Sequence, residues 1–171
     1  MIRYATSGVV FLALFLAERA FIASLPAPFA AAPLVLAAGV YAVQHLSLPD
    51  GVAWILLGGI ASDALALTPF PYATASSVAA SACAVSLSRS VFTNRSIYGI
   101  LACGSAAIVA KALAGASVLA VLGLGGPGSG WFSPIAELPL ALALGVLSLA
   151  LLFRFAKRIR RMLSSIVMVT P

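Results

Sequence analysis

The amino-acid sequence predicts an all-α integral membrane bundle of about six transmembrane helices. Only 8% of the 171 residues are charged and 63% are hydrophobic, whereas soluble domains carry roughly 25% charged residues. The ten basic and four acidic side chains are too few to cover a water-soluble domain of this size. The apolar residues also fall in runs close to the roughly 20 residues that cross a bilayer.

The chain divides into six such runs, separated by segments rich in proline, glycine or polar residues. They form one polytopic domain, 1–171, with predicted spans at about 7–24, 29–46, 52–67, 72–87, 97–124 and 134–155, and a basic tail at 156–171. The fourth run is rich in alanine and serine. Small residues let helix backbones approach closely, so we expect this helix to lie inside the bundle.

Basic residues are segregated by this assignment. Arg3, Arg89, Arg95 and the tail fall on one side, and the loops on the other side contain no Lys or Arg. By the positive-inside rule, both termini are then cytoplasmic. The basic tail predicts contact with anionic membrane lipids. A nucleic-acid partner is not expected, because no soluble segment combines basic and aromatic residues.

Asp63 and Lys111 are the two charges predicted deep within the membrane. At 1.5 Å per residue they lie about 18 and 21 Å from the inner surface. Each has glycine or alanine one turn away, which is typical of a helix-packing face. We therefore hypothesise a structural Asp63–Lys111 ion pair. The alternative has Lys111 reaching the membrane surface separately and a neutral Asp63 bonded to serines of the fourth helix. A proton or ion site is a second use for such charges.

Other charges lie at the outer edge of the predicted spans. Glu18 and Arg19 end the first run and Glu137 begins the last. Arg19–Glu137 or Glu18–Arg19 contacts are possible, and each side chain can equally reach headgroup water. Together with Trp131, a predicted interfacial anchor, these residues are candidates for an outer rim that binds a partner protein.

The sequence predicts no enzyme. It contains no Ser/His/Asp set, no metal-ligand spacing and no phosphate-binding glycine loop before a helix. No cofactor is expected. His45, the single histidine, and the two cysteines, Cys83 and Cys103, are interpreted as interfacial and packing residues.

One stretch resembles a known family. Gly59 and Asp63 in the third run, followed by a turn at Pro69 and Pro71, are similar to the glycine, the aspartate and the Pro-x-Gly turn of the rod shape-determining protein MreD family. Pro71 stands where the family has glycine. The resemblance extends over nearly the whole chain, with six spans, cytoplasmic ends, a basic tail, and prolines around Trp131.

This resemblance implies a non-enzymatic component of the bacterial cell-elongation complex in the inner membrane. Such a protein supports peptidoglycan synthesis and cell shape. Its implied partners are MreC and, through it, MreB, RodA and a penicillin-binding protein. The implied fold is similar to the substrate-binding subunits of energy-coupling-factor transporters. The alternative function is therefore a membrane subunit that binds a vitamin-type small molecule.

Overall fold

A computed structural model describes residues 2–26, 29, 32–67, 70–91, 96–122 and 133–167. Within these residues there are helices and no strands, which confirms the predicted all-α class. The first helix comprises α1 (Ile2–Leu16) and a π-helical turn, η1 (Ala17–Ile22). The remaining helices are α2 (Leu34–His45), α3 (Leu48–Ala66), α4 (Tyr72–Ser90), α5 (Ile97–Val121), α6 (Ser133–Ala136) and α7 (Leu138–Val167).

Four helical segments are long and apolar enough to cross a membrane, which supports a membrane protein. They are Ala5–Ile22, Leu48–Ala66, Ile97–Val121 and Leu138–Ala156. Two of the six predicted spans do not meet this standard. α2 has only 12 residues, or about 18 Å, and α4 is long enough but less apolar. Both contain many buried residues, so neighbouring helices cover much of their surface.

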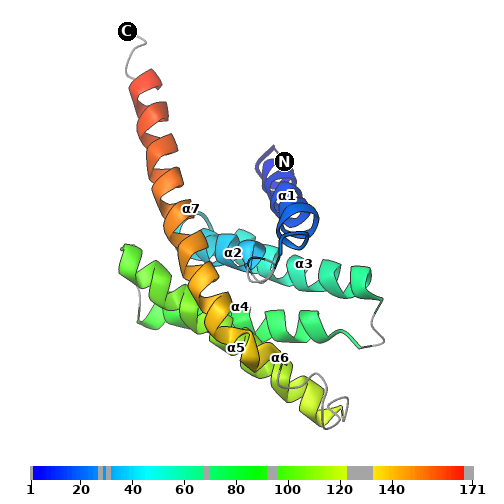
Figure 1. Cartoon of the computed structure of the whole chain (residues 1–171). Coiled ribbons are helices and arrows are strands. Elements are labelled where there is room, and N and C mark those ends of the chain that lie inside the picture. The colour runs from blue at the N-terminus through cyan, green and yellow to red at the C-terminus, as the bar shows by residue number, and fades with distance from the viewer. Residues whose placement is uncertain are drawn as a thin grey trace.

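Successive helices from α2 to α5 are antiparallel, and each packs against the next (Figure 1). α7 crosses α5 and α2, and α1 contacts α2 and α3 through few residues. One end of the bundle is where α2 and α4 begin and α1, α3 and α5 finish. We call it the cap end, for the helix-capping contacts described below. α4 packs against α3, α5 and α2. One of its faces is buried and includes Ser77 and Ala80, whereas Val78 on another face is 51% exposed. The prediction that the fourth helix lies inside the bundle therefore holds for one face of α4.

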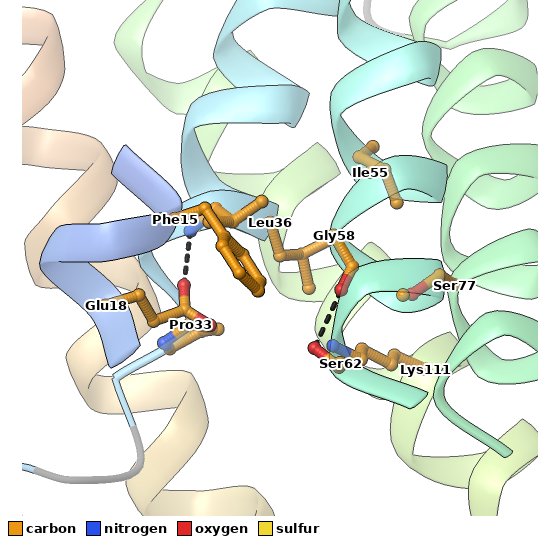
Figure 2. Close-up of a pocket in the computed structure, with 11 residues that line it drawn as sticks. Phe15, Glu18, Pro33, Leu36, Ile55, Gly58, Ser62, Ser77 and Lys111 are labelled. Carbon is orange, nitrogen blue, oxygen red and sulfur yellow. Dashed lines mark hydrogen bonds between the residues drawn. The ribbon is translucent and has the colours of Figure 1, made fainter. Parts of the chain in front are cut away.

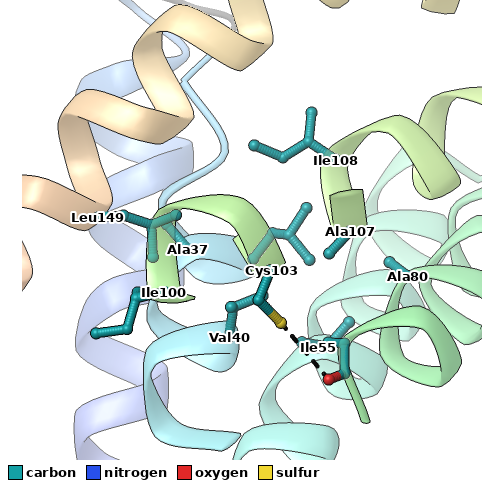
Figure 3. Close-up of a cluster of buried hydrophobic side chains, with 11 residues drawn as sticks. Ala37, Val40, Ile55, Ala80, Ile100, Cys103, Ala107, Ile108 and Leu149 are labelled. Atoms are coloured by element: carbon teal, nitrogen blue, oxygen red, sulfur yellow. Dashed lines mark hydrogen bonds between the residues drawn. The ribbon is translucent and has the colours of Figure 1, made fainter. Parts of the chain in front are cut away.

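A hydrophobic core joins α2, α3, α4, α5 and α7 (Figure 3). Its most buried members include Val40, Ile100, Cys103 and Leu149, all fully excluded from solvent. Cys103 also donates a long hydrogen bond from Sγ to the Ala84 carbonyl oxygen, 3.5 Å away. Cys83 and Cys103 are both free thiols, in keeping with their predicted role in packing.

Glycines set the closest approaches between helices. A Cβ on Gly51 of α3 would lie 2.6 Å from the Gly39 carbonyl oxygen of α2, and one on Gly59 would lie 2.6 Å from Ser77 Oγ of α4. These separations are shorter than van der Waals contact, so only glycine fits without movement of the backbone. Such small residues allow packing between membrane helices.

Two helices that begin at the end opposite the cap end, α3 and α5, have their own N-caps. Ser47 accepts a hydrogen bond from the Asp50 amide, and Ser96 accepts one from the Gly99 amide. The segment 47–51, which the sequence predicts as a break before a span starting at Val52, is therefore already the first turn of α3. A serine cap with proline in the first turn is a common helix start.

Candidate functional site

Four charged side chains gather near the cap end, where η1, α3 and α5 meet. Glu18 and Arg19 come from η1, Asp63 from α3 and Lys111 from α5. Glu18, Arg19 and Asp63 all act electrostatically on Lys111. The sequence predicts two separate groups, one deep and one at the outer edge. The structure instead brings members of both groups into one charged cluster.

The π-helical turn places two adjacent charges on different neighbours. Glu18 and Arg19 both lie within η1. Turns of this kind are rare and widen the helix by one residue. The Glu18 carboxylate reaches α2, and the Arg19 guanidinium reaches α3. A direct Glu18–Arg19 ion pair is not among the contacts of the described residues.

Glu18 caps the start of α2. Its Oε2 accepts a hydrogen bond of 2.6 Å from the backbone amide of Val35 (Figure 2). The residue at the N-cap position of α2 is Pro33, which makes no side-chain cap hydrogen bond. A carboxylate at a helix start also interacts favourably with the helix dipole. Glu18 therefore supplies from the preceding helix the cap that α2 lacks.

Asp63 caps the start of α4, as Glu18 caps that of α2. Its Oδ1 and Oδ2 accept hydrogen bonds of 2.8 and 2.7 Å from the backbone amides of Ala73 and Thr74. α4 also begins after a proline, Pro71, and has no side-chain cap of its own. The carboxylate thus satisfies two backbone donors that a helix start otherwise leaves unpaired.

The hypothesised Asp63–Lys111 ion pair is not formed. Both oxygens of Asp63 are directed to α4, and among the described residues no salt bridge joins the two side chains. The alternative is also wrong in its detail. Asp63 bonds to the backbone amides of Ala73 and Thr74 and to the Thr74 side chain, and not to serine hydroxyls. Lys111 lies within electrostatic range of Glu18, Arg19 and Asp63, without a salt bridge to Asp63.

Arg19 forms neither of the two contacts that the sequence suggests, with Glu18 or with Glu137. Its guanidinium donates a short hydrogen bond to Ser62 Oγ of α3 and lies 5.7 Å from the Phe15 ring centroid. Ser62 in turn donates to the Gly58 carbonyl oxygen at 2.7 Å. Glu137 is exposed at the junction of α6 and α7, and no Arg19–Glu137 pair is present in the described part of the chain.

A small cavity lies within the cluster (Figure 2). Its volume is about 20 Å³, which is room for about one water molecule. The polar groups that line it are Glu18, Ser62, Ser77 and Lys111, and the apolar lining includes Phe15 and Ile55. This is the place where a polar ligand can meet the charged cluster, and it is lined by residues of the first helix, α2, α3, α4 and α5.

The sequence predicts serines of the fourth helix near Asp63, but it does not single out Ser62 or Ser77 as residues of this site. Ser62 adjoins Asp63 in sequence, and Ser77 is one of several serines in α4, so neither carries a distinguishing pattern. Ser7, which accepts a 3.0 Å hydrogen bond from Trp54 Nε1, was also not predicted. Trp131 and Pro69 lie outside the described residues.

His45 lies away from the charged cluster, at the last residue of α2. Its ring packs edge-on against Tyr41, with centroids 4.9 Å apart, and lies 5.8 Å from Phe153 of α7. In the described part of the chain, no three His, Cys, Asp or Glu side chains come together in a way that could hold a metal ion.

Comparisons with protein-family models, with curated proteins and with solved structures find no match to this chain.

Proposed function

We propose that this protein is a non-enzymatic, MreD-like component of the bacterial cell-elongation complex. In this proposal it is a multi-pass protein of the inner membrane with both termini in the cytoplasm. The observation that carries the proposal is the structural role of Gly59 and Asp63, two of the residues on which the family resemblance rests. Gly59 permits the close approach of α3 and α4, and Asp63 caps α4. Both residues hold helices together, which is typical of a protein whose function is to bind other proteins as a scaffold.

The proposed partner is an MreC-like membrane protein and, through it, MreB, RodA and a penicillin-binding protein. The α1 helix is a suitable contact surface because few residues join it to the bundle. Its exposed side chains include Val9, Leu12 and Leu16. In lipid, helices associate through packing and hydrogen bonds, so a partner helix can pack against this face. The candidate rim of Trp131 and Glu137 is a second contact point.

The alternative, a subunit that binds a vitamin-type molecule, has less support. Sites for such ligands are typically 300–1,000 Å³, whereas the cavity in the charged cluster is about 20 Å³. Three of the four charged side chains of the cluster, Glu18, Arg19 and Asp63, are also engaged in capping helices or in contacts between helices. The geometry therefore favours the scaffold.

Co-purification tests the proposal. The full-length chain, tagged at its C-terminus, is expressed with the MreC-like protein of the same bacterium, extracted in mild detergent and captured. We expect the MreC-like protein to be retained, and depletion of the chain to turn rod-shaped cells round. A second tagged multi-pass membrane protein of similar size is the capture control.

Two results would contradict the proposal. One is failure to retain the MreC-like protein while the captured chain is folded. The other is normal rod shape after complete depletion. Capture of an ATPase module, together with tight binding of a vitamin, would establish the transporter alternative instead.

A further inference from the structure

The cavity in the charged cluster is lined by a lysine and a serine that lack direct partners. No hydrogen bond or salt bridge engages Lys111 within the described residues, and Figure 2 shows its amine turned toward Ser62. Ser77 is only 2% exposed, and its hydroxyl likewise makes no hydrogen bond to a described residue. Lys111 is half-buried, and the only described side-chain atom that is both fully buried and without a hydrogen-bond partner is Gln44 Oε1. The polar atoms of Lys111 and Ser77 therefore keep access to the cavity that they line, where a polar group is costly unless something satisfies it.

We propose that this cavity is a binding site for one internal water molecule that bridges Lys111 Nζ and Ser77 Oγ. The ammonium can only donate hydrogen bonds, and a hydroxyl can donate or accept. A water molecule that accepts from Lys111 can donate to Ser77. Ser62 Oγ, which already accepts from Arg19 and donates to Gly58, keeps one lone pair for a third contact.

The size and charge of the site select water over an ion. The volume of about 20 Å³ exceeds the minimum for one water molecule, about 10–15 Å³, and the site offers the two to four polar partners that a buried water needs. Glu18 and Asp63 balance Arg19 and Lys111, so the cluster as a whole has no excess charge to attract an anion or a cation. A neutral, dipolar ligand fits this balance.

The proposed water links side chains that no direct hydrogen bond joins within the described residues. Arg19 and Ser62 connect η1 to α3, while Lys111 belongs to α5 and Ser77 to α4. A bridging water links these groups and satisfies a charge that is otherwise expensive within a membrane. This role does not depend on the proposed cellular function.

Lysine-selective NMR tests the inference on the full-length protein in lipid nanodiscs. The sequence contains two lysines, Lys111 and Lys157, so labelling with ¹⁵N at Nζ gives two signals, assigned with Lys157→Arg. We expect magnetisation to pass from water to the Lys111 ammonium and to persist when a soluble gadolinium chelate is added. The Lys157 signal, from the basic tail, should broaden. Exchange of sodium chloride for potassium gluconate should leave the Lys111 signal unchanged.

Variants of α4 locate the water. Ser77→Val fills the cavity and removes the hydroxyl, so transfer to Lys111 should fall several-fold. Ser81→Val is the matched control, because Ser81 is also buried in α4 but donates to the Val78 carbonyl oxygen and does not line the cavity. It should leave the transfer unchanged.

Several outcomes would overturn the inference. In the wild-type protein, these are the absence of transfer from water to Lys111, broadening of the Lys111 signal by gadolinium equal to that of Lys157, and a shift of the Lys111 signal when the salt is exchanged. In the variants, it is unchanged transfer in a folded Ser77→Val protein. If Ser77→Val does not fold, the wild-type gadolinium and salt experiments decide the question.

Discussion

At the scale of single residues, two carboxylates serve as helix caps for a helix other than their own. Asp63 accepts from two amides of α4, and Glu18 accepts from one amide of α2. In lipid, an unsatisfied backbone group costs several kcal/mol. The cost of placing a carboxylate near the membrane is thereby offset by backbone donors, without a basic partner in direct contact.

Replacing Asp63 with asparagine should destabilise the protein by about 1–3 kcal/mol. The amide keeps one acceptor oxygen and turns an NH₂ group toward a backbone N–H, so one capping hydrogen bond is lost together with the negative charge. Reversible unfolding in mixed micelles measures the change. Glu137→Gln is the control, since this carboxylate is exposed, and it should cost less than about 0.5 kcal/mol. Equal effects of the two changes would contradict the capping role.

A charge swap between Asp63 and Lys111 should not restore stability. Lysine at position 63 cannot accept hydrogen bonds from Ala73 and Thr74. The Asp63→Lys, Lys111→Asp double variant should therefore be at least as unstable as Asp63→Lys alone. The same unfolding assay compares the three variants. Recovery in the double variant would show that a direct ion pair forms in the membrane.

At the scale of elements, neighbouring helices approach each other closely at glycines, where the absence of a side chain leaves room for the other helix. Gly51 packs against the backbone of α2, and Gly59 packs against α4. α5 and α7 interlock in both directions: a Cβ on Gly104 would strike Leu149, and one on Gly145 would strike Ile108. The crossings therefore depend on glycines from several helices and not on one motif.

Gly51→Ala should cost at least about 2 kcal/mol, because the new methyl group would press on the backbone of Val43 and Gly39. Gly8→Ala is the matched control in α1, where nothing lies within 4 Å of the added carbon. It should be neutral or stabilising by up to about 1 kcal/mol. Thermal unfolding in detergent compares the two. A tolerated Gly51→Ala would show that α2 and α3 do not cross as described.

At the scale of the whole molecule, the described residues form six helices that run through the bundle, but only four of them have the length and apolar character of a typical span. α2 and α4 are the two exceptions, and they are the helices that receive their caps from a neighbour. Their enclosure by other helices explains how polar or short helices can persist in a membrane protein.

Reporter fusions test whether α2 and α4 cross the membrane. Six crossings place 47 and 93 on the same side as both termini, and 27, 69 and 127 on the opposite side. Fusions at these positions to a reporter active only in the cytoplasm, and to one active only outside it, should alternate in this order. The same location for fusions at 27 and 47 would show that α2 does not cross.

Most helix positions could be predicted from the sequence, because apolar runs and proline breaks are local signals. The start of α5 at Ile97 agrees with the predicted 97–124, whereas α3 starts at Leu48 instead of 52 because Ser47 acts as a cap. α7 continues to Val167, through much of the segment predicted as a tail. Charge spacing alone does not mark where such a helix ends.

The partners of the charges could not be predicted in the same way. Depth along a helix places Asp63 and Lys111 at similar levels, but it does not show which way each side chain points. The orientation of Asp63 depends on α4 beginning directly beside it, and that of Arg19 depends on the π-helical turn. Neither feature has a periodic sequence signal.

The two borrowed caps have a consequence for biosynthesis. A backbone amide at the start of α2 donates to Glu18, 17 residues earlier in the chain, and one at the start of α4 donates to Asp63, 10 residues earlier. Each carboxylate has therefore left the ribosome before the amides that need it. If α2 and α4 cross the membrane as the reporter fusions would show, helix pairs α1–α2 and α3–α4 can enter the bilayer as closed hairpins with these backbone donors already paired. Chain order from the N-terminus then becomes assembly order, with each hairpin complete before the next emerges.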